Sequence, residues 1–438
     1  MILPPQIREK IAFRDVIGYD SIKNELLVIS DMFLYKGLYD QIGATLPHGV
    51  LIKGEPGLGK TLLANCFIKA CECTNYLIRN DCSYDNLVKN ITKVFESASK
   101  EADRGKSCII FFDDLDKFAE GTEDEDKKIF VNIQSLMESI KGKRILILAT
   151  VNNIDKIPAS LYRSGRFDKI FDLSVPSLKD AISIIKYYLS KKKVSPFLNY
   201  DDVAKMVKYQ SCASLETLIN NSAIRAKYNR RNEITMEDIV LSYVGKELNY
   251  LKDDEGEKVK KSDEDENMVA LHEAGHVAVF EILVPNSIGF AHVFDESEGT
   301  TRLCKSVNRR PLLLLGALAG KAACELFDKG RVASGCDNDL MKAYHLISDG
   351  IKNNATLGYQ SLFDHDFDSQ TSEISLYQNE AVVRAELQRN DFLVKDILMK
   401  NKEFLFKIRD VLLKKKYILF SDIQNIKKKT KIVPYTIY

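Results

Sequence analysis

Three short, largely apolar runs in the first half of the chain predict buried strands. They cover Gly49 to Ile52, Cys108 to Phe112 and Arg144 to Thr150, and polar residues follow each within a few positions. Runs of this length, bounded by turn signals, are typical of strands that are covered on both faces. The first run leads through a glycine-rich turn into a segment of helical character, Leu62 to Lys69. The pattern therefore predicts an α/β domain.

The second half of the chain has helical patterns instead. Met268 to Leu283 predicts one helix, and Ser306 to Asp328 predicts a second, amphipathic helical region. Ser372 to Lys429 is rich in helix formers and lysine, which favours further helices with a solvated lysine face. Between the two halves, Leu251 to Asn267 is highly charged and poor in apolar residues, so we expect a linker there.

Composition sets broad limits on the protein class. A chain of 438 residues has room for two or three domains, and its 45% hydrophobic and 29% charged residues are ordinary for a soluble protein. A net charge of +1 gives no reason to expect nucleic acid as a partner. Nine cysteines without a C-x-x-C pair indicate a reducing compartment. The longest apolar run, Leu312 to Gly320, is too short to span a membrane, so we expect a soluble, cytoplasmic protein without a transmembrane segment.

The predicted helix from Met268 to Leu283 contains the pattern H-E-x-x-H. His272 and His276 are four residues apart, so both imidazoles face the same side of the helix and can bind one zinc ion. Glu273 is placed to act as the general base that takes a proton from a zinc-activated water. Residues 277–282 contain no glycine or histidine, which excludes the metzincin spacing. The third ligand must therefore come from far along the chain.

The glycine-rich turn after the first strand fits the P-loop pattern G-x-x-x-x-G-K-[ST]. It lies between a predicted strand and a predicted helix, which is the context that the motif requires. Backbone amides of the loop can surround the phosphates of ATP, while Lys60 reaches the β and γ phosphates and Thr61 binds Mg²⁺. The expected contacts are Gly54, Pro56, Gly57, Leu58, Gly59, Lys60, Thr61 and Leu62.

Polar residues at the ends of the next strands suit the remaining parts of a nucleotide hydrolase. Asp113 would hold Mg²⁺ through water, and Asp114 would polarise the attacking water. Asn152 stands where a sensor of the γ-phosphate would be. Arg163 and Arg166 lie close together in a loop and suit an arginine finger supplied to the nucleotide of a neighbouring subunit.

With these motifs in place, residues 12–248 resemble an AAA+ ATPase module, and the whole chain resembles the FtsH-type AAA proteases. Phe13 to Gly18 is similar to the adenine-contacting turn of the family, which implies nucleotide contacts at Ile17 and Gly18. Gly165 to Asp168 is similar to the second region of homology, and Ser211 to Ala226 to the lid helix. The family's Gly-Ala-Asp before that helix is replaced by Cys-Ala-Ser at residues 212–214.

The same resemblance implies a third zinc ligand. Residues 334–340 are similar to the family segment that supplies an aspartate, which places the ligand at Asp339, at the start of a helix from Leu340 to Ile351. Asp337 is the alternative and could instead cap that helix. His345 is chemically suitable, but we interpret it as a surface histidine. Gly299 to Cys304 could form an edge strand that binds substrate by β-addition.

Three departures from the family pattern are visible. The family has N-terminal transmembrane helices, whereas this chain begins almost at the ATPase, either as a soluble relative or as a trimmed piece. Asp114 replaces a glutamate, and the shorter side chain predicts slower ATP hydrolysis. The substrate-gripping loop lacks its glycine, and Tyr84 is the nearby aromatic that could grip substrate or simply pack.

The sequence as a whole predicts an ATP-dependent zinc metalloendopeptidase that forms a ring, a homohexamer, and cleaves unfolded or threaded polypeptides with Zn²⁺, ATP and Mg²⁺. The alternatives are an ATP-gated peptidase with little unfolding power and a non-proteolytic remodelling scaffold. We expect a nucleotide-binding subdomain at 1–174, a helical lid at 175–248, a linker at 249–266 and a mainly helical protease domain at 267–438.

Overall fold

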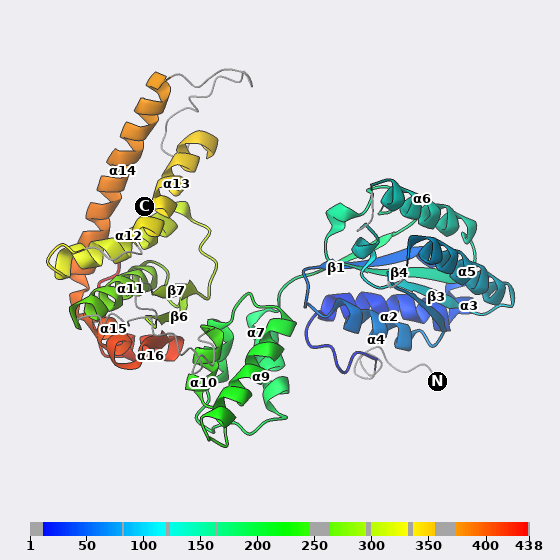
Figure 1. The fold of residues 1–438 in the computed structure, drawn as a ribbon, viewed down its shortest axis with the longest axis horizontal. Coiled ribbons are helices and arrows are strands. Elements are labelled where there is room, and N and C mark those ends of the chain that lie inside the picture. The colour runs from blue at the N-terminus through cyan, green and yellow to red at the C-terminus, as the bar shows by residue number, and fades with distance from the viewer. Residues whose placement is uncertain are drawn as a thin grey trace. The chain divides into compact units, whose positions relative to one another are not determined.

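The computed structural model describes residues 12–80, 83–119, 123–162, 165–245, 263–294, 299–331, 336–354 and 373–436 (Figure 1). The chain divides into two compact units. The first contains residues 1–198 and 209–247, and the second contains residues 199–208 and 248–438. The short segment 199–208, which the sequence placed in the lid, thus groups with the second unit. The division into four domains remains a prediction.

The first unit is built on a parallel sheet of five strands in the order β2-β3-β4-β1-β5. Every residue of β3 and β4 is buried, as the unbroken apolar runs predicted. The crossover order brings the end of β1 beside the ends of β4 and β5. The strands are β1 (Gly49–Gly54), β2 (Thr74–Ile78), β3 (Cys108–Phe112), β4 (Ile145–Val151) and β5 (Lys169–Leu173).

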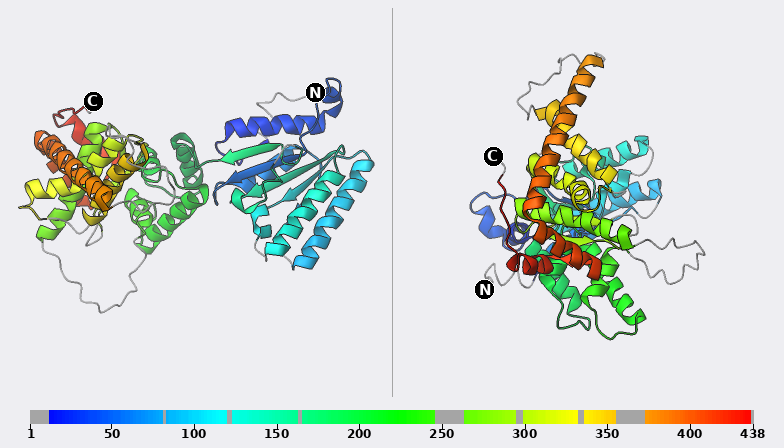
Figure 2. Two further views of the ribbon diagram at one scale, coloured as in Figure 1. Left: turned by 90° about the horizontal axis from the view of Figure 1, so that it is seen from above. Right: turned by 90° about the vertical axis from the view of Figure 1, so that its left-hand side faces the viewer.

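Helices cover both faces of this sheet (Figures 1 and 2). Ile109 and Phe111 of β3 point into the core beneath α2 and α4, whereas Ile110 and Phe112 point into the core beneath α5 and α6. Side chains alternate along a strand, so a strand buried on both faces must be apolar at every position. The helices of this region are α2 (Asp20–Leu34), α3 (Lys36–Asp40), α4 (Lys60–Ala70), α5 (Tyr84–Asp103) and α6 (Glu123–Ser139).

Further helices follow the sheet. The lid helix expected at Ser211 to Ala226 is α9, and Ser211 caps it by accepting a hydrogen bond from the backbone amide of Ser214. The first unit contains η1 (Leu115–Ala119), η2 (Ile154–Lys156), α7 (Leu178–Leu189), α9 (Cys212–Tyr228) and α10 (Met236–Tyr243), and α8 (Tyr200–Met206) belongs to the second.

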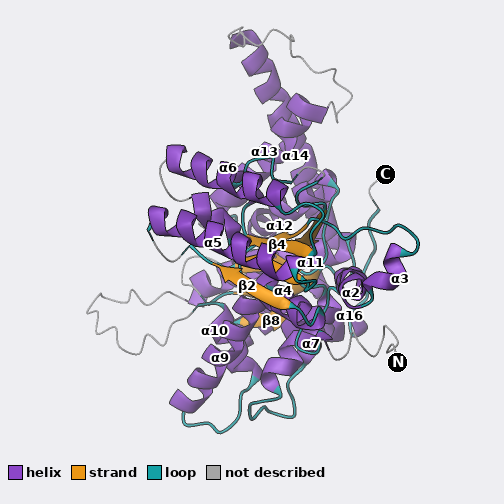
Figure 3. Cartoon of the chain, turned by 90° about the vertical axis from the view of Figure 1, so that its right-hand side faces the viewer, coloured by secondary structure: helices purple, strands orange, loops and turns teal. Residues whose placement is uncertain are grey.

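The second unit is mostly helical (Figure 3) and packs around α11. Every residue of α11 from Val269 to Ile282 is buried, because α12, α15 and the small sheet surround the helix. The helices are α11 (Asp263–Leu283), α12 (Arg310–Phe327), α13 (Cys336–Asn354), α14 (Glu373–Lys400), α15 (Lys402–Lys415) and α16 (Phe420–Lys428).

A small antiparallel sheet in the order β7-β6-β8 completes this unit. Its strands are β6 (Ile288–His292), β7 (Thr300–Leu303) and β8 (Tyr417–Leu419). β7 is an edge strand of this sheet, as expected for the segment Gly299 to Cys304. The lysine-rich C-terminal region forms helices α14 to α16, but the sequence pattern did not reveal β8 between them.

The two helices that carry the predicted zinc ligands begin earlier than expected. α11 begins at Asp263 rather than at Met268, so the helix extends into the charged segment. α13 begins at Cys336 rather than at Leu340, which puts Asp337 and Asp339 inside its first turn. Asp337 is therefore not the residue before the helix, which is the position that the alternative role as a cap would require. Acidic residues are favourable at this end of a helix because they complement the helix dipole.

Candidate functional site

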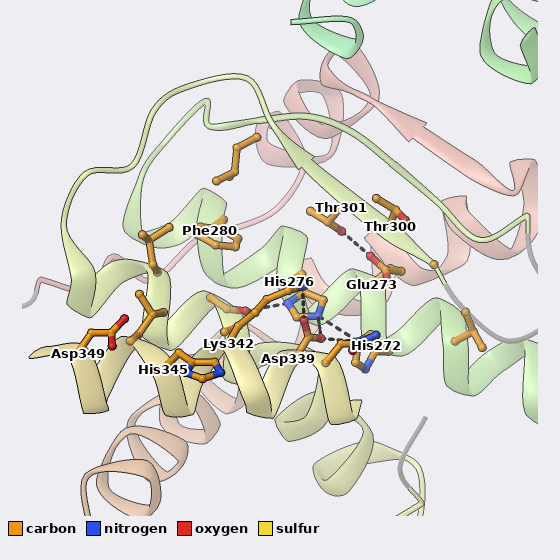
Figure 4. A pocket seen from close by; sticks show the side chains of 18 residues that line it. His272, Glu273, His276, Phe280, Thr300, Thr301, Asp339, Lys342, His345 and Asp349 are labelled. Atoms are coloured by element: carbon orange, nitrogen blue, oxygen red, sulfur yellow. Dashed lines mark hydrogen bonds and ion pairs between the residues drawn. The ribbon is translucent and has the colours of Figure 1, made fainter. Parts of the chain in front are cut away.

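The H-E-x-x-H segment lies in the buried middle of α11. His272 and His276 direct their Nε2 atoms toward each other, 3.0 Å apart, and both lie close to Asp339 of α13 (Figure 4). The Oδ2 atom of Asp339 is 3.1 Å from His272 Nε2 and 2.9 Å from His276 Nε2. One ligand atom from each of the three residues lies within 4.8 Å of the other two. The structure thus brings together the three side chains named as ligands.

Each imidazole has a second partner that fixes its orientation. His276 Nδ1 lies 2.7 Å from the backbone carbonyl of Gly316 in α12, and His272 Nδ1 lies 3.6 Å from the thiol of Cys336 in α13. With Nδ1 engaged, Nε2 of each ring is left for a metal. Gly320 of α12 leaves room for the ring of His272, because a Cβ there would be 2.4 Å from the imidazole.

The carboxylate of Asp339 gives this site a negative charge next to the two imidazoles, which suits a divalent cation. Burial alone would raise the pKa of Asp339, but hydrogen bonds from His272 and His276 hold it well below its usual range. Burial alone would lower the pKa of His276, yet Asp339 and Glu273 raise it overall. Two imidazole nitrogens and one carboxylate oxygen are a donor set that zinc accepts, so these residues fit Zn²⁺.

A cleft of about 670 Å³ opens over the three side chains. The edge strand β7 lines one side through Thr300 and Thr301, together with Gly299 just before it. Glu273 faces the cleft and accepts a hydrogen bond of 2.6 Å from the hydroxyl of Thr301. His345 also lines the cleft, but it is exposed and is not in the cluster formed by the two histidines and Asp339. Asp337 is likewise exposed and outside that cluster.

The P-loop of the first unit runs from the end of β1 to the start of α4. Gly59 caps α4 with φ of 89°, a conformation that glycine adopts without strain. The Lys60 ammonium donates to the backbone carbonyls of Gly54 and Glu55, at 2.7 Å each. Burial lowers the pKa of Lys60, and the carboxylates of Asp114, Asp116 and Asp113 offset part of that effect.

The carboxylates after β3 meet the P-loop and the end of β4. Thr61 donates to Asp113 Oδ1 at 2.8 Å, and Thr150 donates to the same oxygen at 3.0 Å. Asn152 donates its side-chain amide to Asp114 Oδ1 at 3.1 Å. The hydroxyl of Thr61 and the carboxylate of Asp113 are hard oxygen ligands that fit Mg²⁺.

Other predicted contacts with the nucleotide also gather around this loop. Gly18 lies against Asp180 at the start of α7, since a Cβ on Gly18 would be 3.0 Å from the Asp180 carboxyl carbon. Next to Gly18, the Tyr19 hydroxyl lies 3.2 Å from the carbonyl of Leu58. Ala213, at the start of α9, donates its backbone amide to the carbonyl of Gly57 at 3.1 Å. The replaced Cys-Ala-Ser segment thus contacts the P-loop directly.

The predicted arginine finger is only partly described. Arg163 lies outside the described residues. Arg166 donates to the carbonyl of Ser160 at 2.6 Å and lies 3.6 Å from Glu138. Asp168 accepts hydrogen bonds from the backbone amides of Gly165 and His48, and so fixes the loop next to Arg166. Tyr84 is the first residue of α5 and packs on the hydrophobic core beneath that helix.

Several contacts at these sites were not anticipated from the sequence. Thr150 stood at the end of a predicted strand, where its contact with Asp113 could have been suspected. Thr301, Gly316 and Cys336 lie 28, 40 and 64 residues from their partners on α11, and no local pattern links them.

Comparisons with known proteins show similarity to ATPases and to zinc metalloproteases. Residues 50–175 match the model of the ATPase family associated with various cellular activities, AAA. The chain is 32% identical over 299 residues to the ATP-dependent zinc metalloprotease FtsH of Streptobacillus moniliformis, which covers 64% of this chain and 42% of that protein. This chain is similar in sequence to the FtsH-type AAA proteases.

Two further FtsH proteins extend the similarity. That of Mycoplasmoides gallisepticum is 27% identical, over 76% of this chain and 46% of that protein. FtsH 2 of Thermoanaerobacter sp. is 26% identical, over 92% of this chain and 80% of that protein. The chain spans less than half the length of the first two FtsH relatives. Among the described residues, no helix is both long and apolar enough to cross a bilayer.

Proposed function

We propose that this chain is an ATP-dependent zinc metalloendopeptidase that acts as a homohexameric ring on unfolded or threaded polypeptides. The observation that carries the proposal is the convergence of His272, His276 and Asp339 beside Glu273 in one cleft. The P-loop constellation in the same chain supports the dependence on ATP.

The residues of the cleft have distinct roles in this proposal. His272, His276 and Asp339 would hold the zinc, which would supply the Lewis acidity that makes water a nucleophile near neutral pH. Glu273 takes the proton of that water and delivers it to the leaving amine. The substrate lies along the free edge of β7, whose backbone groups can pair with an extended peptide.

The nucleotide site is organised in a similar way. Thr61 and Asp113 would hold Mg²⁺, which would neutralise developing charge on the phosphates. Lys60 contacts the phosphates, Asp114 orients the attacking water, and Asn152 positions Asp114 through its amide. Arg166, with Arg163, contacts the nucleotide of the neighbouring subunit. A ring follows from this sharing, because each subunit completes the site of the next.

A second candidate is a peptidase that ATP gates without forceful unfolding. Tyr84, the nearby aromatic that could grip substrate or simply pack, is half-buried and packs on the hydrophobic core. Asp114 is in addition one methylene shorter than the family's glutamate. Both features favour a ring that exerts little force on a folded substrate.

Degradation of two substrates tests the proposal. A stably folded tagged protein and an unfolded one are incubated with ATP or with a non-hydrolysable analogue, and the Glu273→Gln protein is the blank. Loss of the folded substrate only with ATP supports an unfolding protease. Cleavage of the unfolded substrate alone, equally with the analogue, supports the gated peptidase. No cleavage above the blank contradicts the protease assignment.

A further inference from the structure

The general base does not stand alone on α11 but is in contact with the edge strand β7. The hydroxyl of Thr301 donates to Glu273 Oε2 at 2.6 Å (Figure 4). Glu273 is almost fully buried, with 4% of its surface exposed. A charge-assisted hydrogen bond of this length is among the stronger ones in proteins, and it restricts the carboxylate to one position.

Gly299, next to β7, also leaves the space that the side chain of Glu273 occupies. A Cβ on Gly299 would be 2.2 Å from Glu273 Cγ and 2.6 Å from its Oε1. Real side-chain atoms do not approach so closely, so any larger residue at 299 would displace the carboxylate. One segment therefore restrains the Glu273 carboxylate in two ways: Gly299 leaves space for it, and the Thr301 hydroxyl donates a hydrogen bond to it.

This contact matters because a glutamate side chain has several rotatable bonds and a base must be held close to one geometry. Misplacement of a catalytic group by about 1 Å can cost on the order of a hundredfold in rate. The zinc ligands on the same helix fix α11 but not the χ angles of Glu273. Thr301 supplies the restraint that the helix itself lacks.

We propose that Thr301 is a positioning residue for the general base Glu273, and that Gly299 leaves the space in which the base is held. This inference rests on the proposed peptidase function of the same cleft. It gives β7 two tasks, since one segment would pair with the substrate and also orient the base that acts on it.

Variants of Thr301 test the inference in the full chain. Thr301→Val keeps the branched shape but removes the hydroxyl, and Thr301→Ser keeps the hydroxyl. Cleavage of a short unfolded peptide is measured as kcat and KM, with zinc content as a control. We expect Thr301→Val to lower kcat about tenfold or more with KM and zinc unchanged, and Thr301→Ser to stay within about threefold of the wild type. Equal kcat for Thr301→Val and wild type, or equal loss in both variants, would overturn the inference.

One additional measurement separates this inference from failure of the proposed function. Crystal structures of the wild type and Thr301→Val test the position of Glu273 without any assay. A carboxylate that stays in place without the hydroxyl contradicts the inference, even if no peptide is cleaved. A wild type no more active than Glu273→Gln contradicts the proposed function instead.

Discussion

Each imidazole of the zinc site uses its two nitrogens for different tasks. Nδ1 of His276 is engaged by the carbonyl of Gly316, and Nδ1 of His272 by the thiol of Cys336. Such outer partners select the tautomer and orient the ring, so the ligand geometry is largely built before a metal binds. Asp339 completes the set from a different helix and carries the negative charge that offsets the cation.

Two neighbouring aspartates allow a sharp test of the third ligand. Asp339→Ala should lose zinc, because two histidines alone leave the site one ligand short. Asp337→Ala should retain one zinc per chain, since Asp337 is exposed and lies outside the cluster. Zinc content of the purified variants, measured after dialysis against a mild chelator, gives the answer. The reverse pattern would identify Asp337 as the ligand.

At the scale of elements, the ends of β1, β3 and β4 place the proposed catalytic groups of the nucleotide site together. Asp113 follows β3, Asn152 follows β4, and Lys60 opens the helix after β1. Parallel strands present their carboxyl ends at one edge, so motifs separated by about 50 or 90 residues in sequence converge there. The loop before β5 is fixed separately, by Asp168 and the backbone amides of His48 and Gly165.

The loop that carries Arg166 should therefore depend on the ionisation of Asp168. Burial alone would raise the pKa of Asp168, but hydrogen bonds from His48 and Gly165 lower it overall. A carboxyl whose pKa is lower in the folded state stabilises the fold above its unfolded pKa of about 3.9, and this contribution is lost as the pH falls through the folded value.

We expect Asp168→Ala to reduce the free energy of unfolding by about 1 kcal/mol at pH 7, a modest value because solvent partly screens the carboxylate. The difference from wild type should shrink as the pH approaches 3. Urea unfolding of both proteins at pH 7, 5 and 3.5 measures it, with Asp172→Ala, an exposed aspartate on β5, as the control. A difference that does not vary with pH would show that the ionised carboxylate is not responsible.

At the scale of the whole molecule, the proposed ATP hydrolysis and the proposed peptide hydrolysis belong to different units. The first unit holds the P-loop and its carboxylates, and the second holds the zinc ligands and the cleft. In the proposed ring, Arg166 would act on the neighbouring nucleotide rather than on its own. Its bond to Ser160 shows where the side chain rests within one chain.

Mixing two inactive variants tests this sharing between subunits. Lys60→Ala removes nucleotide binding, and Arg166→Ala removes the finger, so each homogeneous ring should hydrolyse little ATP. In rings formed from an equal mixture, about a quarter of the interfaces should combine an intact P-loop with an intact finger, and ATPase activity should return in proportion. A mixture as inactive as its components, although mixed rings form by native mass spectrometry, would contradict the finger in trans.

The sequence by itself determined the features whose chemistry depends on local spacing. His272 and His276 share one helical face because four residues make about one turn, and Glu273 follows His272 directly. The P-loop glycines likewise lie within eight positions. The largely apolar runs predicted a sheet covered on both faces. This prediction is also local, because successive side chains of a strand point to opposite faces. These predictions needed no knowledge of the fold, and the elements that carry them are present.

Only the tertiary structure decided which distant residues serve those motifs. Thr301 contacts Glu273 and Gly316 contacts His276 because β7 and α12 pack against α11. Cys336 reaches His272 because α13 packs against α12. The start of α13 at Cys336, which places Asp339 in the first turn, likewise became visible only in the folded chain. No periodicity encodes such contacts, because they depend on how several buried faces fit together at once.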